Sequence, residues 1–281
     1  MPNLRIQSGH LRRLSLFLYH SISTHYHDSN MTTDISSEIS TLASRYENEA
    51  FLEADPSRFM HEVEGDTNRE TTAFVASALS YGSRRQFFPR IRRIIDLAHG
   101  DVHRWVTEGL FADDIADDDA CFYRLYTNHT MRTFLSALRS LLLTHGSLRS
   151  FVAQATAGSG DALDAVAAIC RYFAAHGSVG VIPKDTTSAC KRVCMFMRWM
   201  VRDGSPVDLG LWADIIDKRT LIMPLDTHVL QEAARMGLIS GKSASMSTAR
   251  KLTMRMREIF PDDPLHADFA LFGLGVDDTP R

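Results

Sequence analysis

Two charged residues near the middle of the chain stand at the expected starts of helices. Lys191 follows the polar turn 184–188 and lies in the first turn of a helix that we predict over residues 189–202. Asp226 follows an apolar run and is the expected N-cap of a second helix, which ends near Gly237. An amine can act as a nucleophile, and a carboxylate can stabilise positive charge or relay a proton. Each residue alone also has an ordinary interpretation, a solvated lysine and a structural helix cap.

The helix predicted over residues 189–202 has an apolar stripe and several cations. The apolar residues at helical spacing, which require a hydrophobic core, are Val193, Met197, Met200 and Val201. The cations, which we expect to face a ligand outside the core, are Lys191, Arg192, Arg198 and Arg202. Thr187 or Ser188 is expected to accept a hydrogen bond from the first free N–H groups of this helix.

The order of these residues resembles a known superfamily. Ile182-Pro183 is followed after four residues by Ser188-Ala189, and Lys191 follows after one more residue. Asp226-Thr227-His228-Val229 comes later in the chain. This order is similar to that of the helix-hairpin-helix DNA glycosylase/lyase superfamily. The resemblance implies that Lys191 attacks the sugar C1′ atom, that Asp226 assists, and that hairpin N–H groups hold DNA phosphates. The two residues are 35 positions apart (226 minus 191), which resembles the archaeal 8-oxoguanine DNA glycosylase branch more than the endonuclease III branch.

The hairpin departs from the superfamily pattern because it has no Gly-x-Gly. Lys184-Asp185-Thr186-Thr187 stands at that place, and glycine is the residue that lets a backbone approach a phosphate most closely. The archaeal branch also tolerates an atypical hairpin. The resemblance therefore implies DNA contacts at Lys184, Thr186, Thr187, Ser188 and Arg192. The whole pattern, from about Phe51 to Val276, also resembles a bacterial family, DUF2400.

The last predicted helix carries a second pair of candidate residues. Asp268 and Phe272 are four positions apart and therefore lie on one face. By resemblance to the archaeal branch, which has Asp and Trp at this spacing, the pair would hold an extruded base. The alternative is a capping or solvated Asp beside a core Phe. His228 is expected to support the loop at Asp226 rather than bind metal, and Trp199 and Trp212 are further stacking candidates whose spacing is more typical of a core.

Residues 82–93 contain five arginines and no acidic residue. A solvated charged surface is the ordinary interpretation of such a run. The resemblance favours a DNA edge at residues 83–86, in which Arg84 and Arg85 meet phosphates and Gln86 or Phe87 enters the gap left by the base. The later cluster at Tyr123, Arg124 and Tyr126 offers another phosphate contact, although packing of the two tyrosines in the core is the preferred interpretation.

Composition limits the class of protein. The chain has 281 residues, 44% of them hydrophobic, a net charge of −3 and no run of about 18 apolar residues that would span a bilayer. We therefore expect no membrane segment. None of the four cysteines belongs to a CxxC pair, which favours a cytoplasmic protein with reduced thiols. The absence of a cysteine after Cys194 predicts that the iron–sulfur cluster of many superfamily members is missing. Cys190 and Cys194 are expected to be buried thiols rather than metal ligands, and we predict no metal and no cofactor.

No segment alternates like a strand, so the sequence predicts an all-α fold. Residues 1–34 are expected to be disordered or an upstream extension, and residues 35–281 a single helical domain. By resemblance, that domain is a two-lobed glycosylase fold with an atypical hairpin, one lobe being 68–202 and the other 35–67 with 203–281. The helices expected outside the hairpin region are 35–52, 71–81, one ending at Gly146, one starting at 147, 161–175, and 248–260 capped by Ser247. Residues 99–120 are expected to be a connection.

These observations lead to one functional hypothesis and one alternative. The hypothesis is a monomeric base-excision glycosylase that acts on damaged DNA, most plausibly on oxidised purines, with AP-lyase activity through a Schiff base on Lys191. The alternative is a non-catalytic helical protein that binds nucleic acid and retains the glycosylase fold. The sequence does not identify the lesion or decide between duplex, single strand and RNA.

Overall fold

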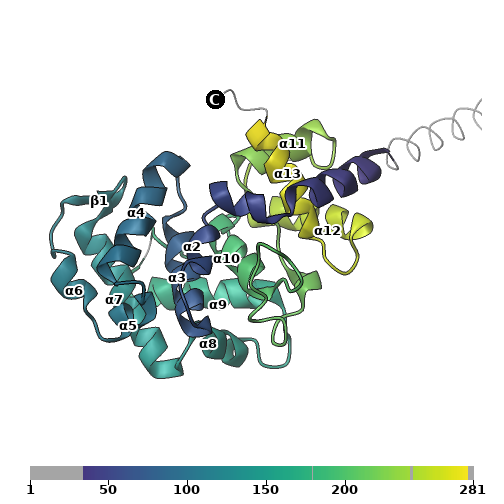
Figure 1. Cartoon of the computed structure of the whole chain (residues 1–281). Coiled ribbons are helices and arrows are strands. Elements are labelled where there is room, and N and C mark those ends of the chain that lie inside the picture. Colours follow the sequence, from purple (N-terminus) through teal and green to yellow (C-terminus); the bar gives the residue numbers. More distant parts are fainter. Residues whose placement is uncertain (1–33, 179, 241–242, 278–281) are drawn as a thin grey trace, which may run out of the picture.

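The computed structural model describes residues 34–178, 180–240 and 243–277, and helices make up most of this part (Figure 1). The all-α prediction is confirmed apart from one antiparallel hairpin, in which Cys121 pairs with Thr127 and Tyr123 with Tyr126. None of the described helices combines the length and the apolar character that crossing a bilayer requires. The expectation for residues 1–34 falls almost entirely outside the described residues.

Most of the described elements follow one another closely along the chain, and residues 202–217 form a long connection after α10. A helix over residues 34–46 comes first. The elements after it are η1 (Glu49–Ala54), α2 (Arg58–His61), α3 (Asp66–Leu79), α4 (Arg84–Leu97), α5 (Val102–Thr107), α6 (Phe111–Asp114), β1 (Cys121–Tyr123), β2 (Tyr126–Thr127), α7 (Asn128–His145), α8 (Leu148–Ala155), α9 (Ala162–Ala175), α10 (Lys191–Val201), η2 (Lys218–Thr220), α11 (Thr227–Arg235), α12 (Met246–Ile259) and α13 (His266–Asp277).

Several predicted boundaries were wrong for identifiable reasons. The segment expected to be a connection, 99–120, contains α5 and α6, because the Asp101 side chain caps α5 by accepting from Arg104 N at 2.9 Å. Ser245, not Ser247, caps α12 through Thr248 N at 3.2 Å. α3 begins at residue 66 rather than 71, and the first predicted helix ends at residue 46 and gives way to η1.

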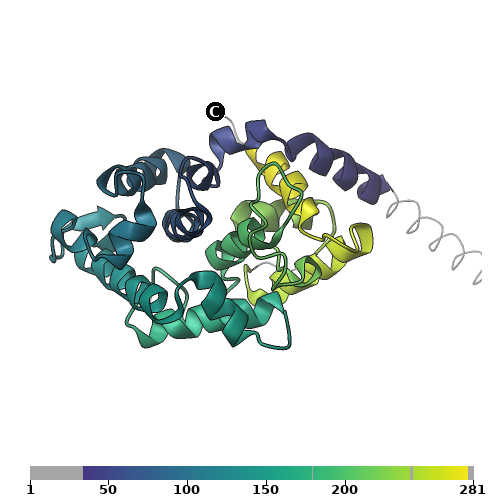
Figure 2. The same cartoon turned by 60° about the horizontal axis from the view of Figure 1, so that its bottom comes forward.

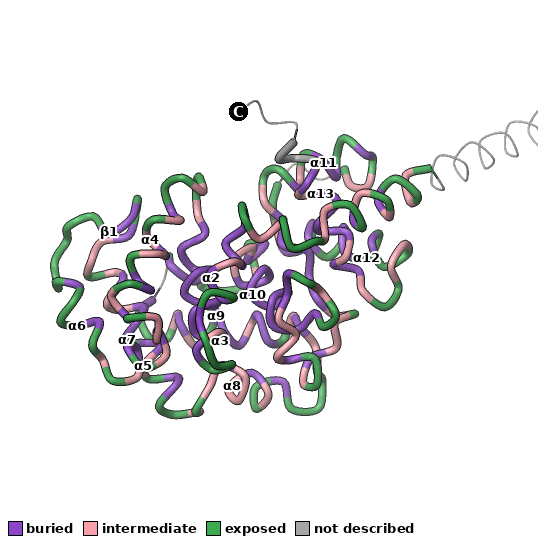
Figure 3. The backbone as a smooth tube through the Cα atoms, in the orientation of Figure 1, coloured by how far each residue is buried: buried purple, intermediate pink, exposed green. Residues whose placement is uncertain are grey.

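Two helices, α3 and α10, form the centre of the molecule (Figure 3). Residues 70–79 of α3 and 193–201 of α10 are buried on every side. Phe74 meets Phe196 with ring centroids 5.0 Å apart, and Phe196 meets Trp212 at 5.1 Å. Each such side chain stabilises the fold by about 1.5–3 kcal/mol. The helix that begins at Lys191 is therefore held rigidly.

The first and last described segments lie side by side. Residues 34–54 cross over α13, and the chain from α4 to α9 occupies the other half, with α10 between them (Figures 1 and 2). Phe51 packs edge-on against Phe269, with ring centroids 5.0 Å apart. The exact boundaries of two lobes stay a prediction, since α2 packs mainly on α3.

A buried ionic network joins α10 to both of these segments. Arg198 and Arg202 are 3% and 2% exposed, so the expectation that they face an external ligand was wrong. Arg198 pairs with Asp268 and, at 3.2 Å, with Asp208. Arg202 binds Asp208 at 2.6 Å, Asp263 at 2.7 Å and Glu47 at 2.9 Å. These acidic residues come from three separate segments of the chain, around residue 47, around residue 208 and from 263–268, so the network fixes the relative positions of these segments.

Replacing Glu47 with glutamine tests this network. Burial raises the pKa of Glu47, but hydrogen bonds from His266 and Arg202 outweigh it and lower the pKa from 4.5 to about 2. A lowered folded-state pKa stabilises the protein above about pH 4.5, and the contribution is lost as the pH falls towards 2. We expect Glu47→Gln to lower the free energy of unfolding by roughly 2–3 kcal/mol at pH 7. The difference from the unsubstituted protein should shrink between pH 4.5 and pH 3, measured by urea unfolding.

The exposed neighbour Glu49 has no described side-chain partner, so Glu49→Gln is the matched control and should change little. A Glu47→Gln effect of the same size at every pH would show that the carboxylate charge is not what the network uses.

Candidate functional site

The fold brings Lys191 and Asp226 together. Lys191 Nζ lies 3.6 Å from Asp226 Oδ2, and the two side chains are 28% and 24% exposed. Lys191 is the first residue of α10, and Asp226 is the N-cap of α11. The amine and the carboxylate are thus neighbours on the surface of a pocket, although α10 and α11 are separated by 25 residues of chain (201 to 227).

Asp226 uses its two oxygens for different partners. Oδ1 accepts from Val229 N at 2.9 Å, which confirms the predicted N-cap, and Oδ2 faces Lys191. The segment before Asp226 is anchored because Met223 N donates to the buried Thr253 hydroxyl of α12 at 2.9 Å. The carboxylate is therefore fixed to the backbone by one oxygen and faces Lys191 with the other.

The start of α10 differs from the prediction. Neither Thr187 nor Ser188 caps the helix, because its N-cap is Cys190, in a left-handed conformation with φ 46° and without a side-chain cap. Ser188 Oγ instead accepts from Cys190 N at 3.4 Å, and Cys190 O accepts from Cys194 N at 2.9 Å. This sharp entry turns Lys191 towards Asp226 while Cys190 stays buried.

Lys191 and Asp226 line a pocket of about 600 Å³. Its walls come from η1 and the turn after it, from the end of α3 and the start of α4, from α10, from the start of α11 and from α13. The size lies within the range of sites that bind small molecules or single nucleotide bases. The pocket is thus formed by segments that the buried network and the central helices hold in place.

The predicted pair on α13 lies in this pocket. Asp268 is buried and bound to Arg198, so the interpretation as a solvated residue was wrong. Burial raises the pKa of Asp268, and the charge of Arg198 opposes this. Phe272 lines the pocket beside Phe51, with ring centroids 5.8 Å apart. The two residues give the pocket a charged inner wall and an aromatic one.

The predicted stacking tryptophans do not belong to the site. Trp199 and Trp212 are fully buried in the core and absent from the pocket wall, so their stacking role was wrong. His228 is exposed on the pocket rim. Arg84 also lines the pocket, where its guanidinium lies 5.4 Å from the centroid of the Phe272 ring and donates to Ala54 O at 2.9 Å.

Residues 83–86 begin a helix rather than a loop. Ser83 is the N-cap of α4, and Arg85 and Gln86 are exposed in its first turn. Phe87 is only 5% exposed, so its predicted insertion into a base stack was wrong. Gln86 remains accessible, and its Oε1 accepts from Arg124 Nη1 at 3.3 Å.

The hairpin residues and Arg192 are partly occupied by contacts within the protein. Asp185 Oδ1 accepts from both the N–H and the hydroxyl of Thr187, at 2.9 and 2.6 Å, and these bonds lower the pKa of Asp185. Arg192 donates to Ala78 O and to Tyr126 Oη at 2.5 Å each. Lys184, Thr186 and Ser188 lie in the same turn, on the surface between α9 and α10.

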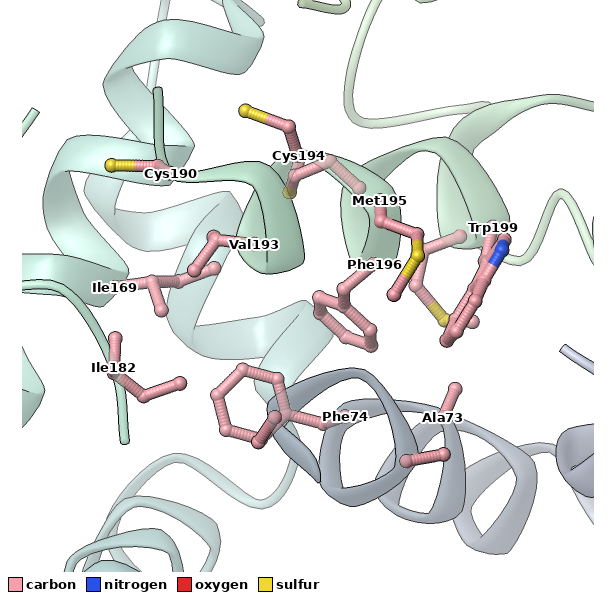
Figure 4. Close-up of a cluster of buried hydrophobic side chains, with 14 of the residues drawn as sticks. Ala73, Phe74, Ile169, Ile182, Cys190, Val193, Cys194, Met195, Phe196 and Trp199 are labelled. Carbon is pink, nitrogen blue, oxygen red and sulfur yellow. The ribbon is translucent and has the colours of Figure 1, made fainter. Parts of the chain in front are cut away.

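Three of the four cysteines, Cys170, Cys190 and Cys194, are buried, and Figure 4 shows Cys190 and Cys194 at the start of α10. Cys170 Sγ is 3.9 Å from Cys190 Sγ, and this contact lowers the pKa of Cys190 to about 7 and raises that of Cys170. Burial raises the pKa of Cys194. Among the described residues no group of three or more His, Cys, Asp or Glu side chains is placed to hold a metal ion.

Sequence reasoning missed other residues of the pocket wall. Tyr81, Asp55 and Phe51 line it and come from segments that were expected only to support the fold, and Met195 lines it from the same helix as Lys191. The one available signal was the end of the buried helix α3, because a polar or aromatic residue at the end of a buried helix lies where that helix reaches the surface. Phe51 and Asp55 carried no signal of their own.

Comparison with known proteins adds the family. No match was found among curated proteins or among solved structures. A family model described as a protein of unknown function, DUF2400, matches residues 55–277, which include Lys191, Asp226, Asp268 and Phe272. This range covers most of the chain and all of the pocket wall except Phe51. The chain therefore belongs to the DUF2400 family.

Proposed function

We propose that this chain is a DNA base-excision enzyme, a glycosylase with AP-lyase activity that acts on damaged bases of the oxidised purine class. The observation that supports this best is the 3.6 Å approach of Lys191 Nζ to Asp226 Oδ2 at a pocket of about 600 Å³. The order of hairpin, lysine, capping aspartate and terminal Asp-x-x-x-Phe, similar to that of the glycosylase superfamily, is the second support.

The pair has distinct roles in the proposed reaction. Asp226 accepts a proton from the Lys191 ammonium and transfers it to the departing base, and the carboxylate that this transfer restores stabilises the positive charge that builds up on the sugar. The neutral amine forms a bond to C1′ while the bond from C1′ to the base breaks, and the base leaves with the proton from Asp226. Opening of the sugar gives a Schiff base, and loss of a C2′ proton then expels the 3′ phosphate and cuts the strand.

The remaining pocket residues would receive the extruded base. Phe272 and Phe51 provide an apolar wall for stacking, and Arg198 and Asp268 provide polar groups at the inner end. Stacking and hydrogen bonds offset the few kcal/mol that extrusion from a duplex costs. A base placed on Phe272 would displace Arg84, whose guanidinium would then meet the adjacent phosphate. We propose damaged duplex DNA as the partner and a monomer as the active form.

Borohydride trapping with a Lys191→Gln variant tests the nucleophile. We expect a covalent protein–DNA adduct on labelled duplex carrying 8-oxoguanine or an abasic site, beside uracil for comparison. Lys191→Gln should reduce the adduct to background, because glutamine cannot form an imine. Lys251→Gln changes an exposed lysine of α12 without a described partner and should keep the adduct.

Other outcomes of this experiment separate the alternatives. An adduct that persists in Lys191→Gln would remove this residue from the mechanism. No adduct on any substrate together with release of free base would indicate a glycosylase without lyase activity. No adduct and no base release, despite DNA binding, would indicate a non-catalytic binding protein.

An Asp226→Asn variant separates the cap from the charge. The amide oxygen still accepts from Val229 N, so thermal stability should stay close to that of the unsubstituted protein, whereas Asp226→Ala should lose about 1 kcal/mol. Single-turnover base release by Asp226→Asn should slow by about 10²- to 10³-fold, because the developing positive charge has lost its carboxylate. An unchanged rate in Asp226→Asn would reduce Asp226 to a structural cap.

A further inference from the structure

A second concave surface lies beside the pocket, between α4 and the β1–β2 hairpin. It encloses about 390 Å³ and is lined by Arg85, Gln86, Pro89, Arg90, Tyr123 and Arg124. In the described part of the chain, none of these three arginines forms an ion pair, whereas Arg92 on the same helix is bound to Glu62. We call Arg85, Arg90 and Arg124 with the surface between them the arginine groove.

Arg124 is held in the groove by its surroundings. It occupies the turn of the hairpin with φ 51°, and its guanidinium lies 4.8 Å from the centroid of the Tyr81 ring. Its Nη1 donates to Gln86 Oε1 at 3.3 Å. Gly82 leaves the room for this placement, because a Cβ at that residue would lie 2.3 Å from Arg124 Nη1.

The hairpin is fastened to the same point of the backbone. Tyr123 Oη donates to Tyr81 O, and Tyr123 is only 3% exposed. The guanidinium of Arg124 is therefore placed by the strand beside it and by the end of α3. Such an arrangement reduces the side-chain entropy lost when an anion is bound.

The groove continues directly from the pocket. Tyr81, Gly82 and Ser83 line the pocket. Arg124, which lines the groove, lies against Tyr81 and Gly82. The figure shows β1 beside α4 at this edge of the molecule (Figure 1). Two of the acidic residues before the hairpin are engaged elsewhere, Asp117 by His129 and Asp118 by Asn128, both at 2.7 Å.

We propose that the arginine groove binds the phosphodiester backbone of the nucleic acid strand that enters the pocket. Planar guanidinium groups bind phosphate oxygens in pairs, and the groove wall contains no carboxylate. Arg85 and Arg90 are five residues apart on α4, which is about 7.5 Å along the helix axis. This length corresponds to about two steps of one strand. The proposal rests on the proposed function for the identity of the strand only.

The test is equilibrium binding of a labelled, undamaged duplex of about 20 base pairs, measured by fluorescence anisotropy across a range of salt concentrations. The slope of log K against log[salt] is negative, and each lost phosphate contact reduces its magnitude by about 0.9. The double variant Arg90→Gln/Arg124→Gln should therefore reduce the magnitude of the slope by about 2 and weaken the affinity at 0.15 M salt by about tenfold or more. Arg104→Gln/Arg171→Gln, at two exposed arginines without described partners on α5 and α9, is the matched control and should keep both values.

A second variant separates charge from shape. The variant Arg90→Lys/Arg124→Lys keeps both charges and should retain most of the salt dependence. Loss of the salt dependence in this lysine variant would show that substitution at these positions damages the hairpin, and it would overturn the proposal. A glutamine variant that matches the control in affinity and slope would also overturn it. A third contrary outcome is that the protein binds a polyglutamate peptide through Arg90 and Arg124 and binds neither duplex nor single-stranded DNA. The groove would then accept an acidic protein.

The outcome is independent of the chemistry at Lys191, because the probe is undamaged and no bond is cleaved. A protein that fails in borohydride trapping but shows the reduced salt slope would retain the arginine groove as a nucleic acid site. A protein that forms the Schiff base but shows no change in slope would keep the proposed function and lose this inference.

Discussion

The two arginines buried in α10 set the strongest constraint on this structure. Moving a charged group out of water costs several kcal/mol, and only well-placed acidic partners recover that cost. Arg198 and Arg202 obtain them from Glu47, Asp208, Asp263 and Asp268, which approach from both ends of the chain and from the loop after α10. The ring of Phe269 adds a face 4.6 Å from Arg198 and 5.2 Å from Arg202. Any arrangement of α13 or of residues 34–54 that left these charges unpaired would be strongly unfavourable.

This constraint separates the rigid part of the site from its accessible part. The carboxyl-terminal half of α10 is fixed by ions and by the core, while Lys191 at the other end of the same helix is partly exposed. Asp226 shows the same division within one side chain, one oxygen bound to the backbone and one directed to the lysine. The Lys191 amine and the Asp226 carboxylate are thus carried on elements that have little freedom to move, which is what the proposed catalysis would require.

The local features of the site could be predicted from sequence, and the long-range ones could not. Asp226 was recognisable because an acidic residue before Thr-His-Val is a typical helix cap, and the apolar residues 73–79 predicted a buried helix. Arg198 looked like a surface cation because its partner Asp268 lies 70 residues away. No pattern within a single helix indicates such a pairing.

The region from Gly82 to Tyr126 was the hardest to predict. The helix α4 was not among the expected helices, and Pro89 inside it removes a backbone donor, which weakens the helical pattern of the segment. The hairpin has strands of only three and two residues, which is too short for alternation to be visible. The position of the hairpin depends on the contact of Arg124 with Tyr81. Contacts between separate elements are decided by the tertiary fold.

The ionic network also determines how small a fragment of this protein can fold alone. Glu47 and Phe51 precede residue 55, at which the family match begins, yet Glu47 binds Arg202 and Phe51 forms part of the pocket wall. A truncated chain that starts at residue 55 would leave Arg202 with one carboxylate fewer in a nearly water-free interior and would open one side of the pocket. The smallest autonomous folding unit must therefore extend upstream of the family boundary and include the helix over residues 34–46, which supplies Ile39 and Ala43 to the core.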